Sequence, residues 1–214
     1  MTDVLFWGLR GSGKTLGAIL ETWLDWIEGN EIWSNTPLNE GFNTNAKTGK
    51  KGNYKYIETL DLIKESFQSE LPNDDIQRTC IIDETHTQAD SRTSGSHINR
   101  QLVNFVTQAR KRNFRIIYTS QILTGYDVRM RALTDRVVRC LPTIDVNDLG
   151  LGSKNYPEPI EFKYITYVPQ EDWRVENSYT IPRALARKLY PLYETKNPIL
   201  PIEVIMARQE NNER

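Results

Sequence analysis

Residues 8–15 read Gly-Leu-Arg-Gly-Ser-Gly-Lys-Thr, a complete phosphate-binding loop of the pattern G-x-x-x-x-G-K-[ST]. The apolar run 4–7 before it predicts a buried strand, and the apolar segment 16–27 after it predicts a helix. Glycines let the backbone turn tightly so that its N–H groups face phosphate oxygens, and a helix N-terminus favours an anion. A glycine-rich turn that matches by chance is the alternative, but the flanking strand and helix favour a nucleoside triphosphate site.

Each position of this loop has an expected task. Lys14 is expected to reach the β- and γ-phosphates, and the Thr15 hydroxyl to ligate Mg²⁺. ATP is therefore the expected substrate and Mg²⁺ the expected cofactor. The residues predicted to bind the nucleotide are Arg10, Gly11, Ser12, Gly13, Lys14, Thr15 and Leu16.

Two acids follow a second apolar run. Residues 79–84 read Thr-Cys-Ile-Ile-Asp-Glu, which is typical of a central parallel strand whose carboxyl end meets the ligand crevice. Asp83 is then expected to hold Mg²⁺ through water, and Glu84 to polarise the attacking water as a general base. The alternative is that both acids simply begin a solvated loop. Together with the phosphate loop, they favour an ATPase over a kinase.

A third strand, predicted over residues 115–120, places Gln121 beside the phosphate loop and Glu84 if the strands are parallel. A glutamine there can hydrogen-bond both the γ-phosphate and the lytic water. The cations at 110–112 and at 115, the first residue of this strand, outnumber what a helix C-terminus needs. We interpret at least one of them as an arginine finger that enters a neighbouring subunit's site.

The phosphate loop, the Asp-Glu strand and the segment Gln-Ala-Arg-Lys-Arg-Asn before Ile-Ile-Tyr-Thr-Ser-Gln together resemble the FtsK–HerA superfamily of DNA-pumping ATPases. Within it, residues 1–145 resemble genome-packaging ATPases of archaeal viruses and tailless membrane-containing phages. They are also similar to the ATPase domain of zonula-occludens-toxin-like proteins. The resemblance assigns the nucleotide, metal, water-activating, sensor and trans-acting roles to Lys14, Thr15, Asp83, Glu84, Gln121 and Arg110, with Arg112 as the second candidate for the last role.

The resemblance implies a ring, commonly a hexamer or pentamer, that moves double-stranded DNA through its centre. The expected task is packaging a viral genome into a preformed capsid, with a capsid or portal-vertex protein as partner, in the host cytoplasm or on the virion. Alternatives are a filamentous-phage-type assembly or export ATPase and a conjugation or plasmid DNA-transfer ATPase. A nucleotide-binding regulator is the non-enzyme alternative.

Composition agrees with one α/β domain. The chain has 214 residues, 27 Lys and Arg against 28 Asp and Glu, and no apolar run of membrane-span length. Residues 100–139 nevertheless hold nine basic residues against two acidic ones. We assign them to a subunit interface and a phosphate-tracking lumen, or else to a solvated face. The polar loops 39–54 and 90–96 are further candidates for DNA contact.

The predicted fold is an ASCE-type P-loop NTPase, with a mostly parallel sheet flanked by helices. We expect an ATPase core over 1–145 and an extension over 146–214 that packs on the same domain. In this extension, residues 162–168 and 173–180 alternate as an antiparallel hairpin. Its aromatic residues form a candidate base-stacking platform, although packing against a helix is the more common role of such a stripe. They are Tyr164, Tyr167, Trp173 and Tyr179.

Overall fold

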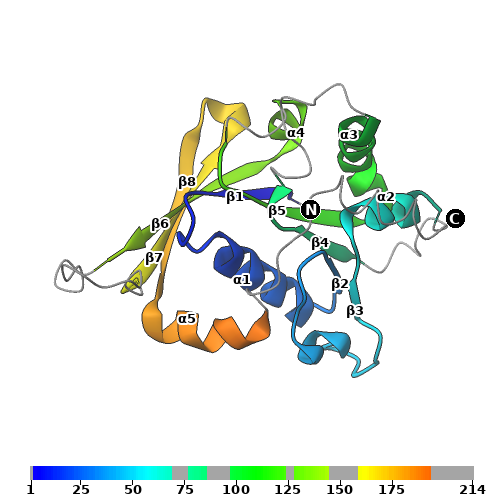
Figure 1. Ribbon diagram of the computed structural model, residues 1–214, viewed down its shortest axis with the longest axis horizontal. Helices are drawn as coiled ribbons and strands as arrows, with labels where there is room; N and C mark the ends of the chain where they lie inside the picture. The colour runs from blue at the N-terminus through cyan, green and yellow to red at the C-terminus, as the bar shows by residue number, and fades with distance from the viewer. Residues whose placement is uncertain (1, 69–76, 86–96, 124–127, 145–158, 194–214) are drawn as a thin grey trace, which may run out of the picture.

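The computed structural model describes residues 2–68, 77–85, 97–123, 128–144 and 159–193. Strands and helices alternate in the first half of the chain, as expected for an α/β domain (Figure 1). The strands are β1 (Val4–Trp7), β2 (Glu31–Ser34), β3 (Tyr54–Tyr56), β4 (Arg78–Ile82), β5 (Phe114–Ser120), β6 (Arg136–Thr143), β7 (Glu161–Val168) and β8 (Arg174–Pro182). The helices are α1 (Lys14–Ile27), α2 (Thr59–Gln68), α3 (His97–Ala109), α4 (Val128–Leu133) and α5 (Arg183–Leu189), with short 3₁₀ turns η1 (Glu40–Asn43), η4 (Arg110–Arg112), η6 (Pro169–Glu171) and η7 (Tyr190–Leu192).

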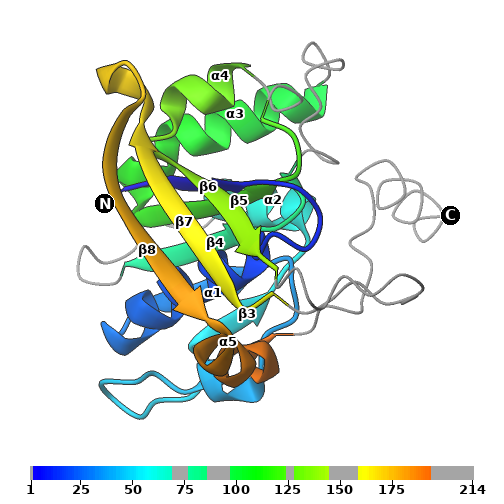
Figure 2. The ribbon, with the colours of Figure 1, turned by 90° about the vertical axis from the view of Figure 1, so that its left-hand side faces the viewer.

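All eight described strands form one sheet in the order β3-β2-β4-β5-β1-β6-β7-β8. The first six are parallel, and β7 and β8 extend the sheet as an antiparallel hairpin, with β8 at the edge (Figure 2). Strand β5 separates β1, which precedes the phosphate loop, from β4, which precedes the two acids. This inserted strand is the mark of the ASCE type, so the predicted fold class is confirmed.

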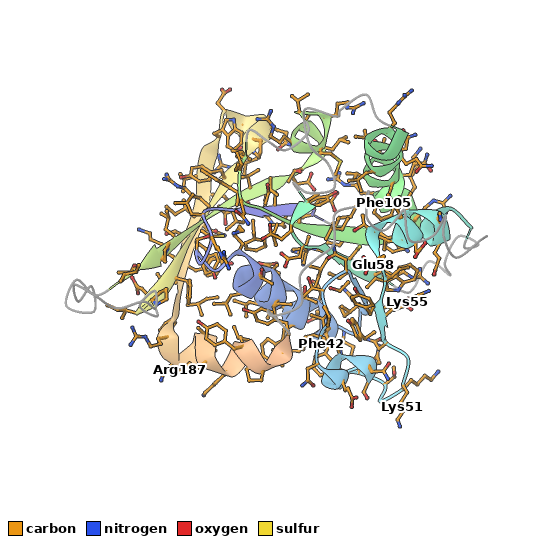
Figure 3. All side chains as sticks on the ribbon, viewed as in Figure 1. Phe42, Lys51, Lys55, Glu58, Phe105 and Arg187 are labelled. Carbon is orange, nitrogen blue, oxygen red and sulfur yellow. The ribbon has the colours of Figure 1, made fainter. Side chains whose placement is uncertain are left out.

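Helices cover both faces of the sheet, as parallel strands require. On one face, α2, α3 and α4 pack through residues such as Leu62, Phe105 and Met130 (Figures 1 and 3). On the other face, α1 and α5 pack through Leu16 and Ala186. The central strands are therefore buried on both sides, which explains why they read as continuous apolar runs rather than as alternating ones.

The aromatic residues of the hairpin do not form one platform. Tyr164 and Tyr179 stack at 4.8 Å between ring centroids, and both belong to the cluster that contacts α1 and α5. Tyr167 contacts Trp173 edge to face at the other end of the hairpin, and Trp173 is 43% exposed. Helix packing is thus confirmed for Tyr164 and Tyr179, whereas the prediction of a single four-residue stripe was wrong.

One further prediction needs correction, and one helix was not predicted. The segment predicted as a loop over 39–54 contains η1 and leads into β3 at its end, and α4 was not predicted. The polar segment 90–96 lies outside the described residues. Within the described ranges, none of the helices is long and apolar enough to cross a membrane.

Candidate nucleotide-binding and hydrolysis site

The phosphate loop connects the end of β1 to the start of α1, and two of its glycines are required by shape. Gly8 has φ +154°, and a Cβ there would lie 2.6 Å from Ser12 Oγ and 2.7 Å from the Cys140 carbonyl oxygen. Gly13 has φ +86°, and its Cβ would lie 2.5 Å from the Phe162 ring. Side chains at either position would therefore displace the loop.

Polar groups in the loop are suited to a polyanion. Lys14 is buried, and its Nζ donates a hydrogen bond to the Leu9 carbonyl of the same loop at 3.1 Å. Ser12 Oγ is buried without a hydrogen-bond partner among the described residues. A phosphate oxygen would satisfy it, because buried hydroxyls normally find partners. Arg10 is exposed, and the Leu16 side chain packs in the core, which leaves only its backbone to face a ligand.

Asp83 and Thr15 meet as the metal prediction requires. Thr15 Oγ1 lies 3.2 Å from Asp83 Oδ1 and 3.3 Å from Oδ2, although 68 positions separate them in the chain. A hydroxyl and a carboxylate are hard oxygen ligands, which Mg²⁺ prefers. This donor set therefore fits Mg²⁺, which Thr15 would ligate directly and the Asp83 carboxylate would hold.

Hydroxyl groups surround the Asp83 carboxylate. Thr119 Oγ1 donates to Oδ1, and Thr36 Oγ1 donates to Oδ2 at 3.4 Å. Burial raises the pKa of the Asp83 carboxyl above its ordinary value, and the bonds from Thr119 and Thr15 and the charge of Lys14 oppose that shift. A bound divalent cation would favour the ionised carboxylate further.

Glu84 follows Asp83 in an unusual backbone conformation. Its φ is +52°, in the left-handed region, which costs a non-glycine residue about 1–2 kcal/mol. Its N–H donates to Thr119 Oγ1 at 2.9 Å, and its Oε2 accepts from Gln121 Nε2 at 3.0 Å. The structure therefore brings Glu84 and Gln121 together across β4 and β5, and strain at this point is what a functional site leads one to expect.

Sequence reasoning missed Asn35, Thr36 and Thr119, which support the two acids from β5 and from the end of β2. Asn35 accepts from the Asp83 N–H at 2.8 Å, in addition to the contacts that Thr36 and Thr119 make with Asp83. The signal was present, because all three are polar residues at or beyond the carboxyl ends of apolar strands. That rule selected Gln121 and applies equally to these positions.

The basic cluster lies elsewhere. Arg110 pairs with Asp135, which precedes β6, at the end of the strands opposite the phosphate loop. Arg115 pairs with Glu21 and Asp25 of α1 at 2.7 and 2.6 Å, and only 11% of its side chain is exposed. Arg115 is thus a structural residue, whereas the Arg110 side chain is 54% exposed.

The strand order, the glycine-shaped loop and the paired Thr15 and Asp83 define the class of this protein, a P-loop nucleoside triphosphatase of the ASCE type. Neither a protein-family model nor a curated protein sequence matches the chain.

Several solved structures share the fold. The N-terminal domain of the zonular occludens toxin from Neisseria meningitidis is 18% identical, with 91% of this chain and all of that chain covered and a TM-score of 0.52. B204, the DNA-packaging ATPase from Sulfolobus turreted icosahedral virus, is 15% identical over 83% of this chain and 96% of that chain, with a TM-score of 0.53. A DnaB-like replicative helicase is 11% identical over 85% of this chain and 56% of that chain, with a TM-score of 0.52. At these identities the likeness establishes the fold, in agreement with the resemblance drawn from the motifs.

Proposed function

We propose that this protein is a Mg²⁺-dependent ATPase that couples hydrolysis to the translocation of double-stranded DNA. The observation that carries hydrolysis is the pair of acids after β4. Asp83 contacts Thr15 of the phosphate loop, and Glu84 stands next to it in contact with Gln121. Lys14 would neutralise the β- and γ-phosphates, Asp83 and Thr15 would hold the metal, and Glu84 would take a proton from the attacking water.

Action on DNA is supported by the fold and only weakly by charge. Two similar structures are a DNA-packaging ATPase and a replicative helicase, and the motifs resemble those of DNA pumps. The basic excess over 100–139 is partly used internally, because Arg110, Arg115 and Arg136 all form ion pairs with acids. In the loop before β3, Lys47 pairs with Glu28, while Lys51 projects from the molecule (Figure 3).

The finer task that we propose is packaging a viral genome into a preformed capsid, by a hexameric or pentameric ring with a capsid or portal-vertex protein as its partner. The similarity to a packaging ATPase over 96% of that protein favours it. The similarity to the toxin domain favours a second candidate, an assembly or export ATPase of the filamentous-phage type.

The test is the ATPase rate with and without double-stranded DNA at concentrations where oligomers form. Stimulation by DNA is expected, and it should decline as salt rises because phosphate contacts release counterions. Lys14→Ala should lose turnover, whereas Lys47→Ala, which removes an exposed lysine, should retain it. Turnover that does not respond to DNA would argue for a nucleotidase without motor activity, and an absence of turnover with DNA present would argue for the nucleotide-binding regulator.

A ring also predicts a shared active site. Arg110 lies a full strand away from its own phosphate loop, so we propose that it acts on a neighbour's nucleotide. Arg110→Ala should then bind ATP, but its rate of hydrolysis should fall by a factor of about 10³ or more.

Mixing variants tests this sharing directly. Arg110→Ala subunits keep the acids and Glu84→Gln subunits keep the arginine, so mixed oligomers should regain activity at interfaces that combine the intact halves. A mixture that demonstrably assembles and stays inactive would exclude Arg110, and Arg112 would be tested next.

A further inference from the structure

The pairing of β2 with β4 ends two residues before Asp83. The ladder runs to Ser34 and Ile81, and the Asn35 N–H still donates to the Ile81 carbonyl at 3.3 Å. The backbone then bends at Asn35 and Thr36. From this point the Asn35 side chain continues the pairing, because its Oδ1 accepts from the Asp83 N–H at 2.8 Å and its Nδ2 donates to the Asp83 carbonyl at 3.2 Å.

The peptide bond between Asp83 and Glu84 is consequently held from two strands. Asn35 beyond β2 binds its carbonyl oxygen, and Thr119 on β5 binds its N–H at 2.9 Å. The position of this peptide group sets the position of the Glu84 Cα. Glu84 has φ +52°, a value that residues other than glycine rarely adopt. Two hydrogen bonds from opposite sides fix the plane of the peptide and therefore the direction of the Glu84 side chain.

We propose that Asn35 is a positioning residue for hydrolysis, which holds the Asp83–Glu84 peptide so that the Glu84 carboxylate faces the attacking water. The inference rests on the proposed ATPase function. The residue type fits the task, since a primary amide offers a donor and an acceptor side by side and carboxylates offer only acceptors. Asn35 is buried at 3% exposure, and its Nδ2 also contacts Thr59 Oγ1 at 3.3 Å, which fixes the orientation of the amide.

The chain supplies a matched control in Asn30, just before the other end of β2. Asn30 is also buried, at 8% exposure, and its Nδ2 contacts Thr79 Oγ1 at 3.4 Å, far from the acids. Asn35→Ala should lower kcat about 10–100-fold while ATP affinity without turnover stays near that of the parent protein. Asn30→Ala, which loses one bond of 3.4 Å, should lower the melting temperature less and leave kcat near the parent value.

A second readout does not depend on activity. Amide hydrogen exchange at Glu84 should become about tenfold faster or more in Asn35→Ala, because its peptide loses one of two anchors, and should not change in Asn30→Ala. If Asn35→Ala does not fold, Asn35→Ser keeps a neutral polar side chain that is too short to bond both the N–H and the carbonyl of Asp83. It should show the same two effects.

The outcomes separate the two claims. A parent protein without ATP turnover would refute the proposed function, and the exchange rate of Glu84 would then decide the role of Asn35 alone. Unchanged Glu84 exchange in the Asn35 variants would overturn the inference whatever the activity. Equal losses of kcat in Asn35→Ala and Asn30→Ala would also overturn it, because general destabilisation would then explain both.

Discussion

The two ends of the parallel strands both bury a carboxylate, Asp3 at the amino ends and Asp83 at the carboxyl ends. The arginines near Asp3 are paired with acids of the same chain. Arg115 pairs with two carboxylates of α1, and the Asp135 Oδ2 accepts from the Asp3 N–H at 2.8 Å. Arg110 also pairs with Asp135, but its side chain is 54% exposed, and it is the arginine that we propose acts on a neighbouring subunit. Around Asp83, the hydrogen-bond donors to the carboxylate within the described residues are hydroxyl groups, from Thr15, Thr36 and Thr119.

The contrast indicates which charges serve the fold and which await a ligand. Burying an ion is costly unless a partner compensates it, so a stable fold matches its buried charges internally. Lys14 donates to a backbone carbonyl and Asp83 accepts only from hydroxyls among the described side chains, so both keep capacity for a triphosphate and its metal. The amino-acid composition does not reveal this division, because it counts a basic residue that stabilises the fold and one that faces a ligand in the same way.

The largest expected effect concerns the site at the carboxyl ends of the parallel strands. Glu84→Gln keeps the size of the side chain and removes the general base, so kcat should fall about 10²–10⁴-fold. ATP affinity, measured with a fluorescent analogue, should not change. The control is Glu176→Gln, on β8 of the hairpin, which removes a carboxylate that pairs with Arg136 of β6. This variant should retain activity. Normal turnover in Glu84→Gln would end its assignment as the base.

At the amino ends of the parallel strands, a substitution should change stability rather than turnover. Arg115→Met leaves Glu21 and Asp25 without the arginine that pairs with them, and the free energy of unfolding should fall by about 2–4 kcal/mol in urea titrations. Turnover per folded molecule should stay near that of the parent. Lys47→Met, which removes one member of an exposed pair, should change stability little. A loss of kcat without a loss of stability in Arg115→Met would place this arginine in the catalytic machinery.

The site at the carboxyl ends of the parallel strands was also the part of the molecule that could best be predicted from the sequence. The loop 8–15 has a spacing that few other structures need, and the rule that parallel strands end together then placed Asp83 and Gln121 beside it. The site also includes Asn35 and Thr119, whose roles depend on which strands are neighbours. Strand order is a tertiary property, and the local sequence does not encode it.

The role of Arg115 could not be predicted from the sequence, for a related reason. Its partners Glu21 and Asp25 lie about ninety positions earlier in the chain, so the local charge pattern grouped Arg115 with the candidate arginine fingers. The hairpin aromatics show the same limit, since alternation predicted the strands but not which face the sheet would bury. Residue-level chemistry was therefore predictable where a motif fixes the neighbours, and not where the fold alone brings them together.

A smaller effect concerns pH at the amino-terminal end. Burial raises the pKa of Asp3 to about 6 from its ordinary 3.8. Between these values the folded chain binds more protons than the unfolded one, so the contribution of Asp3 to stability is largest below pH 3.8 and falls as pH rises to 6. Asp3→Asn keeps an acceptor for the Ile116 N–H, and it should raise the free energy of unfolding at pH 7 by about 1–3 kcal/mol and flatten this slope. An unchanged slope between about pH 4 and 6 would contradict the assignment.

The smallest effects come from a matched pair of threonines, one for each end. Thr79 Oγ1 donates to Asp25 at 2.7 Å near the start of β4, and Thr36 Oγ1 donates to Asp83 at 3.4 Å beyond its end. Both side chains are buried, and valine replaces each hydroxyl by a methyl group of similar size. Thr79→Val should cost about 1–2 kcal/mol of unfolding free energy, because a short bond to a carboxylate is lost, and should leave the Mg²⁺ dependence of turnover unchanged.

Thr36→Val should show the reverse pattern. Its long bond contributes little to stability, so the melting temperature should stay near that of the parent. The Asp83 carboxylate loses one of the hydroxyls that orient it, so the Mg²⁺ concentration for half-maximal turnover should rise, by less than about tenfold. Titrating Mg²⁺ at saturating ATP for both variants measures this directly. If Thr79→Val shifts the Mg²⁺ titration as far as Thr36→Val does, the two ends of the sheet are coupled, and the separation between a structural end and a ligand-binding end fails.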